Sequence, residues 1–253
     1  MKKTIMIALC GIFLSGYSQP DEVNGTKIDS TGNLKFSYRQ LVIPALLIGY
    51  GVVGIESDQL QSFNIELRDE ITENIDKKVT IDDFSQFAPA GTVYLLNAFG
   101  VKGKHDFRDR SVILATSMTL MSVTVYTLKA TTKIERPDGS SKNSFPSGHT
   151  ATAFAGAEFL YQEYKDQSVW YGIAGYAVAT GTGIFRMYNN RHWLTDVVAG
   201  AGIGILSTKA AYWMFPYINR QLSKLGDHYG KTVSFVSPFY DGRNAGMNVV
   251  WVF

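Results

Sequence analysis

The sequence predicts an all-α fold, a helical bundle of five or six apolar helices embedded in a membrane as a multi-span protein. Six mostly apolar stretches follow one another along the 253 residues, and three of them reach the roughly 20 residues that cross a bilayer. Charged residues make up 18% of the chain, below the ~25% usual in soluble domains. A mean hydropathy of −0.02 is low for a chain made mostly of spans, so a soluble helical bundle stays open as an alternative.

The first residues have the pattern of an export signal. Lys2 belongs to a positively charged start, residues 4–14 are apolar, and small residues precede a cleavage position after Ser18. We therefore expect a signal peptide at 1–18. The single cysteine, Cys10, lies inside the apolar run, so the mature chain would contain no disulfide.

The rest of the chain divides by composition into an N-terminal extension (19–40), a helical domain (41–218) and a C-terminal tail (219–253). The third, fifth and sixth apolar stretches of the domain have span length, and the fourth has it only if 147–164 is counted whole. The first two are short and contain glycines or a proline, so we expect them to be half-buried or re-entrant. The six stretches are Leu41–Ile55, Ala88–Val101, Ser111–Thr131, Ala151–Tyr161, Val169–Tyr188 and Leu194–Ile218.

Two further segments have recognisable patterns. In the acidic segment 59–78, apolar residues recur every three or four positions, which predicts an amphipathic helix on the surface of the protein or the membrane. The tail after Thr232 is rich in Val, Phe, Tyr and Trp and contains the turn signal Asp241-Gly242. It therefore predicts a short β-hairpin.

Polar residues form three short motifs in the second half of the helical domain. The motifs are Lys129, six residues and Arg136-Pro137; then Pro146-Ser147-Gly148-His149; then Arg186, five residues, His192, three residues and Asp196. Each motif lies at an end of an apolar stretch. The order of the stretches brings all three ends to one side of the bundle.

The first two motifs suit an anion. Lys129 and Arg136 are seven residues apart, about 10 Å along one helix face at 1.5 Å per residue, although two such cations also occur as snorkelling side chains at a membrane boundary. Ser147 is expected to cap the next helix, whose free N–H groups can bind an anion, and Gly148 lets the backbone approach it closely. His149 would then lie beside a bound phosphate, placed to give a proton to the departing oxygen.

The third motif pairs a histidine with a carboxylate. His192 and Asp196 are four residues apart and would share one face of a helix. An aspartate that accepts a hydrogen bond from one imidazole nitrogen leaves the other nitrogen free to attack, whereas a structural pair at a helix start is the alternative for this motif alone. His105 and His228 lie in polar segments, and we expect both to be solvated.

Together, the three motifs resemble the signature of the type 2 phosphatidic acid phosphatase family, which also includes bacterial acid phosphatases and vanadium haloperoxidases. The resemblance covers roughly 89–216 and is closest to exported bacterial lipid phosphatases such as lipid A phosphatases. It implies in-line displacement at phosphorus without a metal or other cofactor. His192 would be the nucleophile that forms a phosphohistidine, Asp196 would orient it, and His149 would protonate the leaving oxygen. The residues that would bind the phosphate are Lys129, Arg136, Ser147, Gly148 and Arg186.

Two departures from the family pattern concern the substrate more than the chemistry. Phe185 stands where the family usually has serine before the arginine of the third motif. The link from Pro137 to Pro146 is also short. Neither change removes a charge or a nucleophile, so both bear on substrate preference.

The charge of one loop predicts the orientation in the membrane. The basic loop Lys102–Arg110 lies opposite the motifs, which suits the cytoplasm, so the motifs would face the periplasm of a bacterial inner membrane. With a cleaved leader, six crossings would place the motifs in the cytoplasm instead. We therefore expect that Leu41–Ile55 does not cross. If the leader is retained instead, six crossings would also place the motifs in the periplasm. A soluble periplasmic bundle is the alternative in which nothing crosses.

The sequence thus predicts a metal-independent phosphatase whose partners are the membrane and a phospholipid or lipid A type substrate. Lipid A ranks slightly ahead of undecaprenyl diphosphate and phosphatidylglycerophosphate. A soluble periplasmic acid phosphatase of broad specificity is the alternative, followed by a vanadate-dependent haloperoxidase and a non-catalytic lipid-binding protein. A net charge of +2 without a long run of Lys and Arg argues against nucleic acid.

Overall fold

The computed structural model describes residues 36–73, 80–228, 233–240 and 245–252. The signal peptide expected at 1–18 and most of the 19–40 extension lie outside these residues. The elements are α2 (Arg39–Glu56), α3 (Asp58–Thr72), α4 (Ile81–Ser85), α5 (Ala88–Ala98), α6 (Phe107–Thr132), α7 (Gly148–Tyr164), α8 (Val169–Tyr188), α9 (Leu194–His228), β1 (Val233–Tyr240) and β2 (Ala245–Val252). The predicted all-α bundle with a hairpin near the C-terminus is confirmed.

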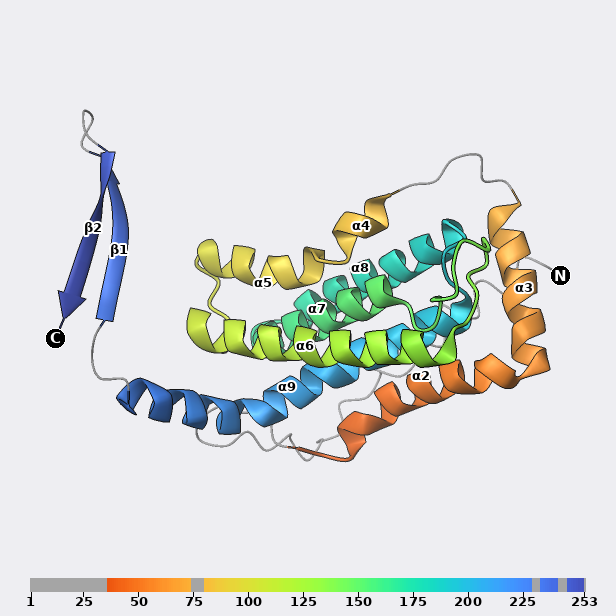
Figure 1. Cartoon of the computed structure of the whole chain (residues 1–253), viewed down its shortest axis with the longest axis horizontal. Helices are drawn as coiled ribbons and strands as arrows, with labels where there is room; N and C mark the ends of the chain where they lie inside the picture. The colour runs from red at the N-terminus through yellow and green to blue at the C-terminus, as the bar shows by residue number, and fades with distance from the viewer. Residues whose placement is uncertain (1–35, 74–79, 229–232, 241–244, 253) are drawn as a thin grey trace. The chain divides into compact units, whose positions relative to one another are not determined.

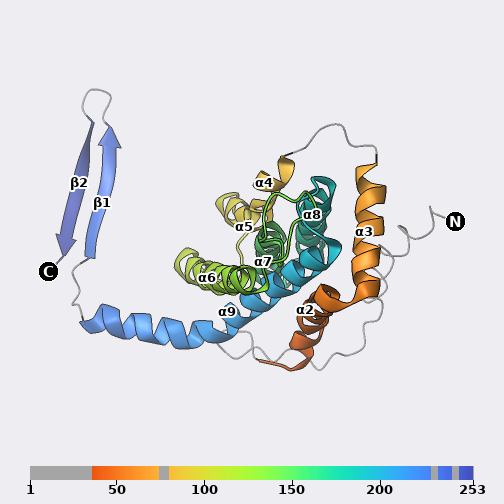
Figure 2. The ribbon, with the colours of Figure 1, turned by 45° about the vertical axis from the view of Figure 1, so that its right-hand side comes forward.

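Helix α7 is the centre of the bundle, packed against α5, α6, α8 and α9 (Figures 1 and 2). Small side chains on α7 and glycines on α9 let these two helices approach closely. A Cβ atom added at Gly200 would lie 2.5 Å from the carbonyl oxygen of Ser147, and one at Gly204 would collide with the carbonyl oxygen of Ala151. This contact fixes the start of α7, which carries the second motif, against the start of α9, which carries the third.

Two of the described helices, α2 and α6, are long and apolar enough to cross a membrane, whereas α8 and α9 have the length but are less apolar. We expected the first stretch to be half-buried or re-entrant, but α2 runs as one 18-residue helix with Pro44 near its start. Few residues of α2 and α6 are buried inside the protein, and large apolar side chains such as Leu46 and Val123 are exposed, as expected for helices in contact with lipid. This pattern is consistent with a membrane protein.

The acidic segment forms helix α3, capped by Ser57, whose hydroxyl accepts a hydrogen bond from the Leu60 amide at 3.5 Å. The predicted helix is confirmed as far as Thr72, and residues 74–79 lie outside the described chain. In the tail, β1 and β2 pair antiparallel, although the turn at Asp241-Gly242 is not described. Helix α9 continues to His228, past the domain boundary that we expected at 218.

The prediction for His105 is wrong. Its side chain is 8% exposed, and its Nδ1 lies 2.7 Å from Oε1 of Glu163, which also accepts a hydrogen bond from the hydroxyl of Tyr212 at 2.7 Å. The residue looked solvated because its neighbours in sequence are polar, while its partners come from α7 and α9. The side chain of His228 lies outside the described part of the molecule.

Candidate active site

The three motifs meet where α6 ends and where α7 and α9 begin. The backbone N–H of Ser147 donates to the carbonyl oxygen of Asp196 at 3.0 Å, which joins the second motif to the third. Lys129, in the last turn of α6, donates through Nζ to the carbonyl oxygen of Ser144 at 3.3 Å and also to that of Asn143. The residues that the sequence singles out are therefore brought to one end of the bundle.

His192 and Asp196 form the buried centre of this site. His192 is 3% exposed and lies just before α9, while Asp196 belongs to the first turn of that helix. Nδ1 of His192 lies 3.5 Å from Oδ2 of Asp196. The same carboxylate oxygen accepts hydrogen bonds from the Ser144 hydroxyl at 2.5 Å and from the Trp193 amide at 2.9 Å. Asp196 is thus held from three directions.

The surroundings of His192 favour a neutral ring. Burial lowers the pKa of His192 to about 4, even though the hydrogen bond and charge of Asp196 act in the opposite direction. The imidazole is therefore neutral at physiological pH. Because Asp196 and Ser144 both lie on the Nδ1 side, Nε2 is the nitrogen left to react.

Arg136 and Arg186 bring guanidinium groups with a buried Nε to the same site. The Nε atoms of both are buried and have no hydrogen-bond partner among the described residues. Burial and the positive charges of Arg186 and Arg191 lower the pKa of Arg136, and Lys129 also interacts electrostatically with both Arg136 and Arg186. A bound anion would offset the repulsion between these cations and would accept hydrogen bonds from the buried N–H groups.

One geometric expectation for the first motif is wrong. Lys129 and Arg136 do not share a helix face, because α6 ends at Thr132 and Lys133 adopts a left-handed conformation with φ of 52°. Arg136 therefore lies in the loop between α6 and α7. The α conformation is disfavoured for a residue that precedes proline, which is consistent with this early end. The loop is tied to the third motif, since the indole N–H of Trp193 donates to the carbonyl oxygen of Glu135 at 2.9 Å.

The start of α7 has the predicted capped geometry. Ser147 is the N-cap, fully buried, and its hydroxyl accepts a hydrogen bond from the Thr150 amide at 3.4 Å. Gly148 follows as the first residue of the helix, and a Cβ added there would have only one neighbour, 3.7 Å away, on Val125. Gly148 therefore leaves room beside its Cα at the start of a helix, where N–H groups can bind an anion.

Two carboxylates of α4 complete the site. Asp82, which is 1% exposed, accepts hydrogen bonds from Nη1 of Arg186 at 2.5 Å and from the side-chain amide of Asn189 at 2.9 Å. Asp83 lies beside it and places Oδ1 2.9 Å from Nε2 of His149. The short helix α4 thus contacts a predicted phosphate ligand and the predicted general acid.

The ligand-type atoms of Asp82, Asp83 and His149 lie within 4.8 Å of one another, close enough to be considered for a metal ion. The neighbouring charges oppose a cation there, because Arg186 is paired with Asp82 and lies 3.9 Å from Asp83. The group fits better as a set of partners for Arg186 and His149 than as a metal site.

Sequence analysis missed Ser144, Asp82, Asp83 and Asn189. Ser144 lies two residues before Pro146-Ser147-Gly148-His149, so a search around that motif would have included it. The two aspartates are separated from their partners by 66 and 104 residues. In the sequence they appear as an acidic pair shortly before an apolar stretch. This pattern does not indicate that they contact Arg186 and His149.

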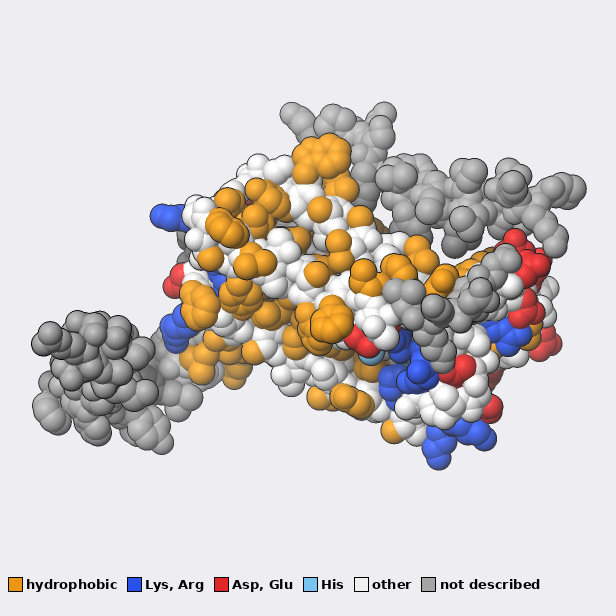
Figure 3. Space-filling model, turned by 90° about the horizontal axis from the view of Figure 1, so that it is seen from above, with side chains coloured by type: hydrophobic (Ala, Val, Ile, Leu, Met, Phe, Trp, Pro, Cys, Tyr) orange, Lys and Arg blue, Asp and Glu red, His pale blue; other side chains and the backbone are white. Residues whose placement is uncertain are grey.

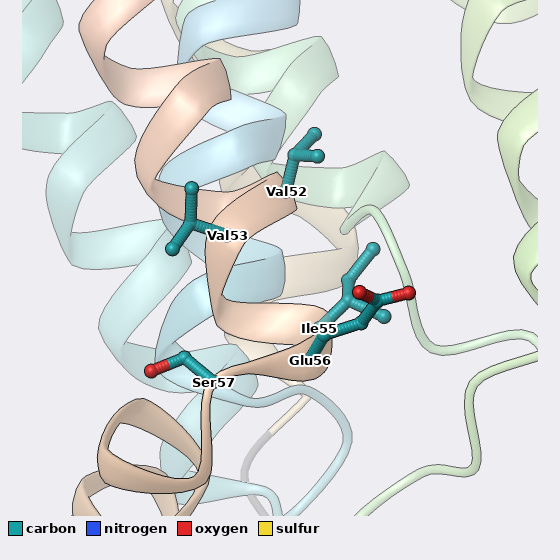
Figure 4. Close-up of a pocket in the computed structure, with 5 residues that line it drawn as sticks. All are labelled: Val52, Val53, Ile55, Glu56 and Ser57. Atoms are coloured by element: carbon teal, nitrogen blue, oxygen red, sulfur yellow. The ribbon is translucent and has the colours of Figure 1, made fainter.

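A groove at the bend between α2 and α3 is not a comparable site. It has a volume of about 550 Å³ and is lined by Val52, Val53, Ile55, Glu56 and Ser57 (Figure 4). Its single charged side chain is a carboxylate, which repels phosphate, and none of the predicted site residues lines it. A much smaller cavity separates α3 from His192 and Trp193.

One family model and two known proteins match part of this chain. The PAP2 superfamily model matches residues 110–220. The lipid A 1-phosphatase of Porphyromonas gingivalis is 44% identical over 141 residues, which are 55% of this chain and 32% of that protein. The bacitracin transport permease protein BcrC of Bacillus licheniformis is 33% identical over 84 residues, which are 32% of this chain and 39% of that protein. This chain therefore spans about a third of the length of these curated relatives.

A solved structure shows the same fold. The transmembrane PAP2 type phosphatidylglycerolphosphate phosphatase of Bacillus subtilis matches with a TM-score of 0.50 and 19% identity, over 74% of this chain and 98% of that one. All three motifs of this chain fall within the residues that the family model matches. The resemblance seen in the motifs is confirmed for residues 110–220, which match the PAP2 superfamily model.

Proposed function

We propose that this protein is a phosphatase that removes a phosphate group from a membrane lipid through a phosphohistidine. The observation that carries the proposal is the pair of buried, unpartnered guanidinium nitrogens of Arg136 and Arg186 beside a neutral, buried His192. The guanidinium groups of Arg136 and Arg186 can donate hydrogen bonds to phosphate oxygens. The neutral imidazole of His192 can act as a nucleophile. Without a bound anion, the two guanidinium groups leave buried N–H groups unsatisfied.

The first chemical step forms a bond between phosphorus and Nε2 of His192. The bond from phosphorus to the leaving oxygen breaks, and His149 gives its proton to that oxygen. Asp196 accepts the hydrogen bond from Nδ1 and stabilises the positive charge that develops on the ring. The residues that hold the other phosphate oxygens are Lys129, Arg136, Arg186, the Ser147 hydroxyl and the Gly148 amide.

The second step releases inorganic phosphate. His149, now neutral, takes a proton from a water molecule whose oxygen attacks phosphorus. The bond between phosphorus and Nε2 breaks, and its electron pair returns to the ring of His192. The enzyme is then ready for another turnover.

Exposed aromatic side chains beside the site support a lipid as substrate. Phe84 and Phe87 are 78% and 60% exposed on α4 and directly after it, next to Asp83. Figure 3 looks onto the side that carries α4 and α5, where apolar side chains cover much of the surface and charged ones gather toward one end. A lipid can place its phosphate at the charged end and its acyl chains along the apolar surface. We rank lipid A first, since the relative from P. gingivalis is a lipid A 1-phosphatase.

A membrane location follows from the same features. Apolar helices α2 and α6 are candidates to cross the bilayer, which for α2 differs from our expectation that Leu41–Ile55 does not cross. The basic loop at 102–110 lies at the other end of α6 from Lys129. By the positive-inside rule, we propose that this loop is cytoplasmic and that the site faces the periplasm across a bacterial inner membrane.

Phosphate release by the detergent-purified protein tests the proposed substrate. Lipid A, undecaprenyl diphosphate and phosphatidylglycerophosphate are compared with a water-soluble phosphate ester at matched concentration. We expect a clear preference for one lipid, because binding energy from the acyl chains contributes to kcat/KM. Equal or better turnover of the soluble ester would contradict the lipid assignment and favour a broad-specificity acid phosphatase.

Activity is expected to survive excess EDTA. Three fixed cations, Lys129, Arg136 and Arg186, supply the positive charge that a metal supplies in other phosphatases. Initial rates of phosphate release with and without the chelator measure this. Full loss that Mg²⁺ or Zn²⁺ restores would overturn the proposed mechanism and would direct attention to Asp82, Asp83 and His149.

A further inference from the structure

We infer that Asp83 is a positioning residue for the general acid: it holds one ring nitrogen of His149 so that the other donates its proton to the leaving oxygen. This inference rests on the proposed function and adds to it a residue that none of the three motifs contains. Asp83 also lies outside residues 110–220, which the family model matches.

The contact has the geometry of an acid with its orienting partner. Oδ1 of Asp83 lies 2.9 Å from Nε2 of His149, and the side chain of His149 is 30% exposed. When the imidazole is protonated, Nε2–H donates to the carboxylate and Nδ1–H is left for the substrate. A carboxylate at this distance also favours the charged ring, which is the form that can give a proton.

The surrounding charges make such a partner necessary. The charged groups that act on His149 are Asp82 and Asp83 from α4 and Arg186 from α8. Arg186 repels a proton on the imidazole, and Asp82 is already hydrogen-bonded to Arg186. Asp83 is the carboxylate better placed to stabilise the imidazolium, because its Oδ1 lies 2.9 Å from His149 and 3.9 Å from Arg186.

Helix α4 is anchored well enough to hold Asp83 in place. Asp82 is buried between Arg186 and Asn189. The hydroxyl of Ser85 lies 2.7 Å from that of Thr182, which gives α4 a second polar contact with α8. The side chain of Asp83 is 53% exposed, so its amide variant should fold normally.

The test compares Asp83→Asn with the wild-type enzyme in detergent, using lipid A and p-nitrophenyl phosphate. Lipid A has a leaving oxygen that needs a proton, whereas p-nitrophenolate leaves without one. We expect kcat for lipid A to fall about 10- to 100-fold, which is part of the usual contribution of a general acid. We expect kcat for p-nitrophenyl phosphate to change about threefold or less. The alkaline limb of the lipid A profile should move to lower pH. Asp83→Glu should restore part of the rate.

The matched control is Asp166→Asn, which removes the same charge from a carboxylate whose side chain is 60% exposed. It should leave both rates unchanged. Equal loss on both substrates with an unmoved pH profile would overturn the inference, as would a lower KM with unchanged kcat, which indicates a carboxylate that competes with phosphate. A wild-type enzyme that releases phosphate from neither p-nitrophenyl phosphate nor any of the three candidate lipids would overturn the proposed function together with this inference.

Discussion

Replacing His192 with alanine is expected to abolish phosphate release. The variant lacks the nitrogen that we propose forms the bond to phosphorus, so the loss in kcat should be about 10³-fold or more. Binding of substrate should persist, since the cations that hold the phosphate are untouched. Steady-state rates and equilibrium binding of lipid A measure the two effects separately.

Two controls make this result specific to the nucleophile. His192→Asn keeps a polar side chain beside Asp196 and should be as inactive as the alanine variant while unfolding at a temperature close to that of the wild type. Acid-labile, base-stable incorporation of phosphate should be detected in the wild type and be absent from both variants. Residual activity above about a tenth of the wild-type rate would exclude His192 as the nucleophile.

The second large effect is expected from Asp196→Asn. The amide has the size of the carboxylate but can donate a hydrogen bond to Nδ1, which would put the ring proton on Nε2 and block attack. By analogy with the same change in catalytic triads, we expect kcat to fall about 10³- to 10⁴-fold, with little change in KM. Steady-state kinetics with the preferred lipid measures this.

Ser144→Ala is the matched control for this prediction. It removes the 2.5 Å hydrogen bond from the serine hydroxyl to Asp196 but keeps the carboxylate and its contact with the Trp193 amide. A loss of about tenfold, at the low end for a hydrogen bond to a charged group, is expected. If Asp196→Asn costs no more than Ser144→Ala, the carboxylate does not set the tautomer of His192.

Most of the fold could be predicted from the sequence because its helices are marked by apolar length and by local capping residues. Ser147 was identified as an N-cap from the helix formers that follow it. The end of α6 was predicted too late, since Lys129 and Arg136 were expected on one helix, because the left-handed Lys133 that ends it carries no glycine or asparagine signal. Local rules therefore give the type of element more reliably than its limits.

The site was predictable to the extent that its residues are grouped in short motifs. His192 and Asp196 lie four residues apart and could be paired without a structure. Asp83 and His149 are 66 residues apart, and their contact depends on how α4 packs against α7 and α8. The burial of His105 was missed for the same reason, since Glu163 and Tyr212 are remote in sequence.

The close approach of α7 and α9 at Gly200 and Gly204 has a consequence for how this enzyme could diversify. No side chain larger than a hydrogen atom fits at these positions, so the part of the molecule that holds the nucleophile tolerates little variation. The outward side chains of α4, such as Phe84, have no such restriction. Engineering of substrate range should therefore begin with libraries on α4 and the start of α5, over an unchanged catalytic scaffold.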